Sequence, residues 1–167
     1  MHPRLRLVGV LSGALCLVGV FGMSCATALP FTSTRCVGCL ETAGQSQYLT
    51  WSIAEGLDFR IFLVILIILG AAVIGYLAGL HRHVTGTASL FASVGAAGAA
   101  FFEGSAGGSR VLPASYEATH PPLSLDVGFY VFIVGAVVAV VASLIMLATS
   151  IRSSDAATDA PLQPLAL

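Results

Sequence analysis

Long apolar stretches separated by short polar segments dominate the chain. Charged residues leave four uncharged gaps of about 20 residues, the length that a helix needs to cross the hydrocarbon core of a bilayer. The gaps cover residues 7–28, 61–80, 84–102 and 127–149. They predict an all-α, polytopic membrane protein, in which residues 1–149 form a single transmembrane domain built as a four-transmembrane-helix bundle.

The third gap is the least apolar, because it consists largely of Gly, Ala, Ser and Thr. Only His81, Arg82 and His83 separate it from the second gap. Two spans joined so closely form a tight antiparallel hairpin whose backbone groups are satisfied within each helix, so we expect them to insert together.

Arginines near the ends of the predicted spans indicate the orientation. One side carries its arginines in short segments, namely Arg4, Arg6, Arg82 and Arg152. The other side carries Arg35, Arg60 and Arg110 in longer and more acidic loops. We therefore expect both termini to be cytoplasmic, with outer loops 29–60 and 103–126 outside and residues 150–167 forming a disordered cytoplasmic tail.

The N-terminus allows a second interpretation. Arg4 and Arg6, the apolar run and Ala26-Thr27-Ala28 together resemble a secretory signal peptide with a small-residue cleavage site. The first apolar run is longer than the usual signal core of about 7–15 residues. We therefore favour a retained first helix, and a cleaved signal peptide is the alternative.

Composition narrows the class of protein. Hydrophobic residues make up 57% of the 167 residues and charged residues 9%, whereas a soluble domain carries about 25% charged residues. The net charge of −1 excludes a nucleic-acid binder that works by neutralising phosphates. All basic residues are arginines, and Ala, Gly and Val are abundant, which is typical of a GC-rich bacterial genome. We expect a multi-pass protein of the bacterial cell membrane, that is, the cytoplasmic membrane.

Small residues recur at four-residue spacing in each predicted span. Residues i and i+4 share a helix face, so such a series forms a groove in which a neighbouring backbone can approach closely. The predicted helix-packing residues are Gly9, Gly13, Ala71, Gly75, Gly79, Ser89, Ser93, Ala97, Gly135, Ala139 and Ser143. A second such face with Ala92, Ala96 and Ala100 places the third span at the centre of the expected bundle.

Strongly polar residues are missing from the interior of the predicted spans. No Asp, Glu, Lys, Arg, His, Asn or Gln lies within the four gaps. Proton relays, ion pathways and voltage sensors need such groups at membrane depth. The sequence therefore argues against a pump, a proton-coupled transporter or a haem subunit, and we expect neither a cofactor nor a metal site.

The first outer loop carries three aromatic residues that fit interface anchors. The rings of Tyr48, Trp51 and Phe59 are of the kind that settles at the level of the lipid headgroups. Residues 46–57, which include Tyr48 and Trp51, are expected to form a short helix that lies on the membrane.

The second outer loop, residues 103–126, has loop composition, because it contains the glycine-rich stretch 104–109 and two consecutive prolines. Ser124 or Asp126 is expected to cap the fourth helix, since both side chains accept hydrogen bonds from backbone amides.

Cys36 and Cys39 in the first outer loop are the pair of residues best suited to a chemical function. A C-x-x-C pair outside the cytoplasm is normally oxidised, so we predict a disulfide between them with a structural role. The motif Cys36-Val37-Gly38-Cys39 and the expected topology resemble the DsbB family of quinone-linked thiol oxidases, which has four helices and a Cys-Val-x-Cys pair in its first outer loop. The resemblance implies a membrane thiol–disulfide oxidoreductase. That family also has a second cysteine pair in its second outer loop, where this chain has no cysteine.

The sequence as a whole favours a function without catalysis. Small-residue packing faces around an interior empty of functional groups predict an accessory, scaffold or assembly subunit of a larger membrane complex. The expected partners are the lipid bilayer and other membrane-protein subunits or further copies of the chain, and not nucleic acid. Two alternatives stay open, namely the thiol oxidoreductase and a small pore or facilitator with a path lined by Ser and Thr of the third span.

Overall fold

The computed structural model describes residues 3–37, 46–52, 59–111 and 124–158. Its helices are α1 (Pro3–Ala26), α2 (Phe59–Leu77), α3 (Arg82–Val111) and α5 (Val127–Thr158). Its strands are β1 (Pro30–Val37), β2 (Ser46–Ser52) and β3 (Ser124–Leu125).

Each of the four helices in the described part of the chain is long and apolar enough to cross a membrane. The candidate spans are Leu5–Ala26, Phe59–Leu77, Arg82–Phe102 and Val127–Ser153. The prediction of four apolar helices is therefore confirmed, and their order along the chain agrees with the pattern of uncharged gaps.

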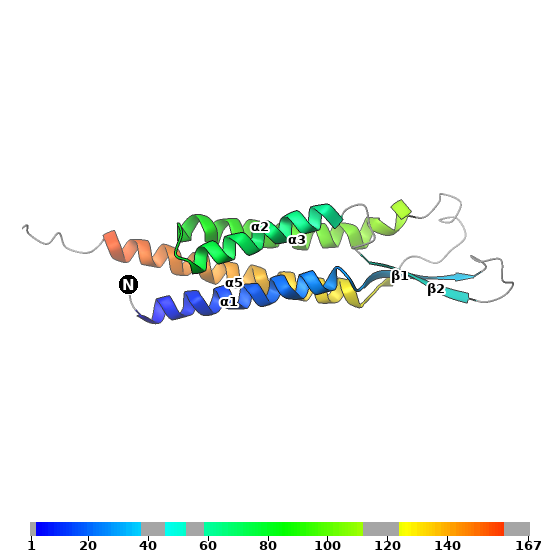
Figure 1. Cartoon of the computed structure of the whole chain (residues 1–167), viewed down its shortest axis with the longest axis horizontal. Helices are drawn as coiled ribbons and strands as arrows, with labels where there is room; N and C mark the ends of the chain where they lie inside the picture. Colours follow the sequence, from blue (N-terminus) through cyan, green and yellow to red (C-terminus); the bar gives the residue numbers. More distant parts are fainter. Residues whose placement is uncertain (1–2, 38–45, 53–58, 112–123, 159–167) are drawn as a thin grey trace, which may run out of the picture.

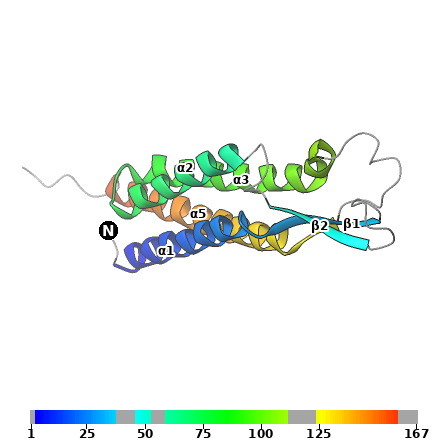
Figure 2. The same ribbon diagram turned by 45° about the vertical axis from the view of Figure 1, so that its right-hand side comes forward.

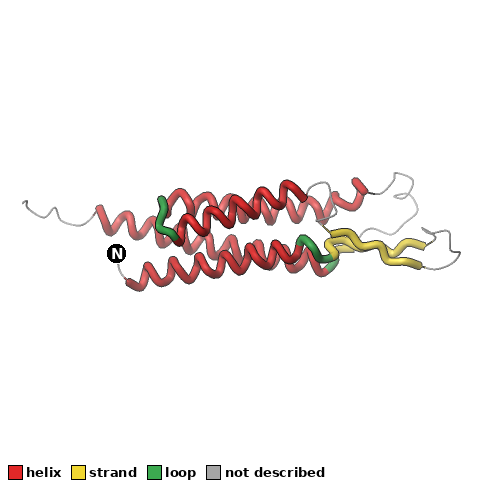
Figure 3. Tube along the Cα trace, viewed as in Figure 1, coloured by secondary structure: helices red, strands yellow, loops and turns green. Residues whose placement is uncertain are grey.

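The helices form an elongated bundle in which consecutive helices run in opposite directions (Figure 1). The start of α1, the turn between α2 and α3 and the end of α5 lie at one end, which we call the termini end (Figures 1 and 2). The strands project from the opposite end, the sheet end (Figure 3). The helix ends that the structure describes therefore lie at two levels, as a four-span membrane protein requires.

α5 is the central helix, because it contacts the other three: α1 and α5 pack more extensively than any other pair of helices, α5 also packs against α3, and its Phe132 contacts Phe62 of α2. Its buried small residues form two adjacent rows, composed of Gly135, Ala136, Ala139, Ala142 and Ser143. Two rows allow one helix to approach closely on each side. The prediction that the third span is central is therefore wrong.

Large apolar side chains point outward and small polar ones point inward. Phe21 and Phe91 are 71% and 74% exposed, whereas Ser89, Ser93 and Ser143 have no exposed surface. A soluble protein shows the opposite distribution. In a membrane the outer side chains contact lipid and the small inner ones let helices pack closely, so the distribution fits a multi-pass membrane protein.

The turn between α2 and α3 depends on Gly79. The amide of Gly79 donates to the carbonyl of Tyr76 at 3.0 Å, and the amide of Leu80 donates to the carbonyl of Gly75 at 2.9 Å. This pair of bonds is a Schellman motif, which needs a left-handed residue just after the helix, and Gly79 has φ of 81°. Gly79 therefore ends α2 and does not belong to a packing face.

The three strands form an antiparallel sheet in the order β2-β1-β3. β1 pairs with β2 from Pro30 opposite Ser52 to Val37 opposite Ser46. The short helix predicted for residues 46–57 is therefore wrong over residues 46–52, and residues 53–57 lie outside the described chain. The β2 sequence SQYLTWS is rich in Tyr, Thr and Trp, which favour strands once a partner strand is present.

Aromatic rings join the sheet to the bundle. Phe31 of β1 is buried and contacts Phe129 and Phe132 of α5 edge to face, with ring centroids 5.4 and 6.2 Å apart. Phe132 makes a similar contact with Phe62 of α2 at 5.4 Å. Because edge-to-face contacts are favourable, this cluster ties β1, α2 and α5 together at the sheet end.

Of the two residues predicted to cap the fourth helix, Asp126 is the one that caps α5. The amide of Val127 donates to its side-chain Oδ1 at 2.7 Å, and the amide of Phe129 donates to its backbone carbonyl at 3.1 Å. Ser124 instead pairs with Ser33 in the sheet. β3, the capping residue and α5 thus follow one another directly in the chain, and the strand and the cap together fix where α5 begins.

Two helices extend beyond their predicted ends. α3 continues through the glycine-rich stretch 104–109 to Val111, so the loop predicted from residue 103 begins later. α5 continues to Thr158, so the disordered tail predicted from residue 150 is wrong for residues 150–158. Adding residues to an existing helix avoids the nucleation cost, which explains why weak helix formers remain helical there. Residues 159–167 lie outside the described chain.

Candidate functional site

Three helices are joined by a buried polar chain near the middle of the bundle. The thiol of Cys16 in α1 lies 3.7 Å from the hydroxyl of Ser143 in α5, and also donates to the carbonyl of Ala139 at 3.7 Å. Ser89 of α3 donates to Ser143 at 2.9 Å. The chain therefore links α1, α5 and α3 through neutral side chains.

A second buried contact joins α2 to α5 nearer the termini end. The hydroxyl of Tyr76 donates to the carbonyl of Met146 at 3.2 Å and lies 2.8 Å from the hydroxyl of Thr149. It reaches them beside Gly9 of α1, where an added Cβ would stand 2.8 Å from the tyrosine oxygen. Gly9 thus leaves the space that Tyr76 occupies.

These buried hydroxyls have hydrogen-bond partners and no net charge. Ser89 and Ser93 have no exposed surface. The Ser93 hydroxyl donates to the carbonyl of Leu90, and the Ser89 hydroxyl, which has one hydrogen, lies within hydrogen-bond distance of both the carbonyl of Gly86 and Ser143. Hydrogen bonds of this kind between membrane helices contribute about 0.6 kcal/mol on average to association. The arrangement is suited to holding four helices together.

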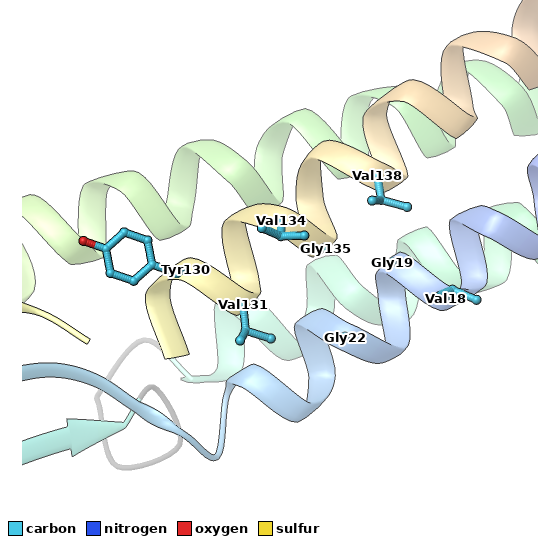
Figure 4. Close-up of a pocket in the computed structure, with 8 residues that line it drawn as sticks. All are labelled: Val18, Gly19, Gly22, Tyr130, Val131, Val134, Gly135 and Val138. Atoms are coloured by element: carbon cyan, nitrogen blue, oxygen red, sulfur yellow. The ribbon is translucent and has the colours of Figure 1, made fainter. Parts of the chain in front are cut away.

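A shallow groove runs between α1 and α5 on the outer surface towards the sheet end; we call it the α1–α5 groove (Figure 4). Its volume is about 360 Å³. Its lining is apolar apart from one tyrosine and consists of Val18, Gly19, Gly22, Tyr130, Val131, Val134, Gly135 and Val138. Of these, Val18 and Val134 are more than 60% exposed, so the rim faces the surroundings of the bundle.

At the floor of the groove the backbones of α1 and α5 approach each other closely. A Cβ at Gly19 would lie 2.7 Å from the carbonyl oxygen of Gly135, and one at Gly135 would lie 2.9 Å from that of Gly19. At Gly22, by contrast, a Cβ would meet nothing within 4 Å. Gly19 and Gly135 therefore belong to the packing of α1 on α5, whereas Gly22 leaves open space in the groove.

A second, smaller groove of about 230 Å³ flanks α1 on the side of α2. Phe59 lines it, together with Val20, Ser24, Thr27, Leu63, Leu66 and Ile67. The hydroxyls of Ser24 and Thr27 bond to carbonyls of α1 itself. Phe59, predicted as an interface anchor, is half-buried at the start of α2 and packs against the core.

The predicted packing residues fall into different environments. Those that are buried, or that leave no room for a side chain beside another helix, are Gly9, Gly13, Ser89, Ser93, Gly135, Ala139 and Ser143. Gly75 faces the methyl group of Thr85, and Ala97 is half-buried. Ala71 is exposed, as is Gly79. α2 instead packs with larger side chains, namely Phe62, Leu66, Leu69, Val73 and Tyr76.

The four-residue spacing missed Gly19, where a Cβ would lie 2.7 Å from the carbonyl oxygen of Gly135 in α5. A three-residue spacing was the available signal, because Gly13, Cys16, Gly19 and Gly22 recur every three residues in α1. Residues i and i+3 also lie on one helix face.

Other predicted site residues lie partly outside the described chain. Cys36 is in β1 opposite Gln47. Cys39 is not among the described residues, so the disulfide stays a prediction. Tyr48 and Trp51 lie in β2, and their role as interface anchors also stays a prediction.

Within the described residues no group of three or more His, Cys, Asp or Glu side chains is placed to hold a metal ion. No family model, no curated protein and no solved structure matches the chain.

Proposed function

We propose that this chain is a small integral membrane protein of the bacterial cytoplasmic membrane, without catalysis of its own, that serves as an accessory, scaffold or assembly subunit of a larger membrane complex. The α1–α5 groove carries the proposal. The buried hydroxyls between the described helices are hydrogen-bonded within the bundle, whereas the groove lies on the outer surface and has open space beside Gly22.

The occupant that we propose for the groove is a transmembrane helix of a partner subunit. A Cβ at Gly22 would meet nothing within 4 Å, so a helix with small residues can approach α1 closely there. The groove lies within the candidate spans, where a partner surface must be apolar, and its valines meet that requirement. The partner contacts α1 and α5 at once, and both helices are already held together beneath it by Gly19 and Gly135.

The proposed orientation places both termini in the cytoplasm. The termini end carries Arg4, Arg6, Arg82 and Arg152 near the helix ends, whereas Arg35, Arg60 and Arg110 lie towards the sheet end. Arginines near the ends of short connections favour the cytoplasmic side. The sheet then lies outside the cytoplasm, where Cys36 is in an oxidising compartment.

Gly22→Leu tests the proposal, because it fills the groove where the bundle itself has open space. The variant and the wild type are purified gently from the native membrane and analysed by native mass spectrometry, with thermal unfolding as a check on folding. Gly98→Leu is the matched control, since a Cβ at Gly98 also meets nothing within 4 Å but lies on α3, away from the groove.

We expect the wild type and Gly98→Leu to retain a second membrane protein at fixed stoichiometry, and Gly22→Leu to lose it while folding normally. A wild-type chain that is found alone, or only with further copies of itself, would overturn the proposal. Turnover of a reduced dithiol with a quinone that disappears in Cys36→Ser would replace it with the thiol oxidoreductase.

A further inference from the structure

The first two residues of β1, Pro30 and Phe31, follow the end of α1 through a short hydrogen-bonded turn. Only residues 27–29 separate α1 from β1. The amides of all three donate to carbonyls near the end of α1, at 3.1 to 3.2 Å. Pro30 and Phe31, which we call the β1 bridge, are therefore held close to the last turn of α1.

The β1 bridge also lies directly against the start of α5. The carbonyl of Phe31 accepts from the amide of Asp126 at 3.0 Å, and the buried ring of Phe31 contacts Phe129 with ring centroids 5.4 Å apart. A Cβ at Gly128 would lie 2.6 Å from the carbonyl oxygen of Pro30, so no side chain separates the bridge from the helix there. The bridge therefore joins the end of α1 to the start of α5.

α1 and α5 are thus held together at two levels. The first is the backbone contact of Gly19 with Gly135, and the second is the β1 bridge. α1 ends seven residues after Gly19, and Gly128 lies seven residues before Gly135, so about 10 Å of each helix separates the two levels. Gly22 and Val131, which line the α1–α5 groove, lie on these two stretches (Figure 4).

We propose that the β1 bridge sets the width of the α1–α5 groove beside Gly22. A helix curves only gently over so short a length, so two helices that are held at both levels keep their separation between them. If the bridge moves off α5, α1 and α5 diverge beyond the contact of Gly19 with Gly135, and the groove widens. A displacement of the sheet is therefore transmitted to the groove.

The consequence for a partner helix rests on the function proposed above. Helices in a membrane associate through close van der Waals packing, which is lost when the walls of a groove move apart. A partner that fits the groove at its present width is therefore held less tightly when the bridge is displaced. The sheet, which lies outside the spans, thereby controls an interface within them.

The test measures the separation of α1 from α5 in the full chain in detergent, by pulsed electron paramagnetic resonance. In a background without native cysteines, spin labels are attached to single cysteines at Phe21 in α1 and Val127 in α5. Both positions are exposed, and neither lines the groove. Retention of the second membrane protein is measured on the unlabelled chain by native mass spectrometry, with thermal unfolding as a check on folding.

Two variants displace the β1 bridge by opposite means. Gly128→Ala pushes it away from α5, because the added methyl group collides with the carbonyl oxygen of Pro30. Phe31→Ala loosens it by removing the buried ring, so it keeps the test valid if the clash at Gly128 impairs folding. Phe31→Leu keeps much of the buried apolar volume. Gly70→Ala is the matched glycine control, since a Cβ there meets nothing within 4 Å and lies on α2.

We expect the distance between the two labels to become longer and more widely distributed in Gly128→Ala and Phe31→Ala. It should stay close to the wild-type distance in Phe31→Leu and Gly70→Ala. Gly128→Ala and Phe31→Ala should also retain less of the second membrane protein, although each leaves the lining of the groove unchanged.

Unchanged distances in folded Gly128→Ala and Phe31→Ala would overturn this inference, and the proposed function would still stand if Gly22→Leu releases the partner. Longer distances with full retention of the partner would overturn the link between the bridge and binding. Longer distances in a chain that has no partner at all would instead overturn the proposed function and support the effect of the bridge on the groove.

Discussion

Gly19 and Gly22 stand one helical turn apart in α1, yet their surroundings differ. A Cβ at Gly19 would lie 2.7 Å from a carbonyl oxygen of α5, which is backbone and cannot move aside like a side chain. A Cβ at Gly22 would meet nothing within 4 Å. Both positions are glycines of the same helix. The same substitution at each therefore separates the effect of packing on stability from the effect of helix propensity.

Gly19→Ala should destabilise the protein, because α1 and α5 must separate to admit the methyl group. Overpacking of this kind costs about 1–3 kcal/mol. Gly22→Ala should leave the stability unchanged or raise it slightly, since alanine is the better helix former. Unfolding of the purified protein in detergent, followed by circular dichroism, measures both.

If Gly19→Ala and Gly22→Ala prove equally stable, the close approach of α1 to α5 is not as described. A result in which only Gly22→Ala is destabilised would show that the open space at Gly22 is filled by another part of the chain.

At the scale of elements, α5 begins where it does because a strand and a cap meet there. The amide of Asp126 donates to the carbonyl of Phe31 at 3.0 Å, while its side chain accepts from the first amide of the helix. A Cβ at Gly128 would lie 2.6 Å from the carbonyl oxygen of Pro30, so β1 passes directly over the start of α5. The sheet and the helix are therefore one connected unit at this end.

Asp126→Ala should lower the free energy of unfolding by about 0.5–2 kcal/mol, because the first turn of α5 loses a hydrogen-bond acceptor. Asp126→Asn keeps an oxygen that accepts from Val127 and should stay close to the wild type. Thermal unfolding in detergent measures the difference. Equal losses in both variants would assign the effect to the negative charge and not to the cap.

At the scale of the whole molecule, the bundle has two distinct ends, and the proposed orientation can be tested directly. In a background without native cysteines, single cysteines are placed at His83, at the termini end, and at Leu125, at the sheet end. Both positions are exposed. A membrane-impermeant thiol reagent added to intact cells should label Leu125→Cys and not His83→Cys. Labelling of His83→Cys from outside would reverse the orientation.

Local features of the sequence predicted a large part of this fold. The four apolar helices and the cap at Asp126 depend on residues close together in the chain, and the structure contains them. Ala71 and Gly79 fitted the same spacing rule as Gly9 and Gly13 but are exposed, because a helix face packs only where a neighbour lies against it. The strands were missed for a similar reason, since β1 becomes a strand by pairing with β2 and β3.

By itself, the sequence determined the number, order and apolar length of the helices, because the free energy of moving a segment from water to hydrocarbon depends on that segment's own residues. Only the tertiary structure decided that α5 is central, that Gly19 rather than Ala71 lies in an interface, and that Tyr76 reaches Thr149 beside Gly9. Those outcomes depend on distances between backbones far apart in the chain, and several helix arrangements satisfy the same hydrophobic pattern. The residues in contact are set by close packing, which is a property of all four helices together.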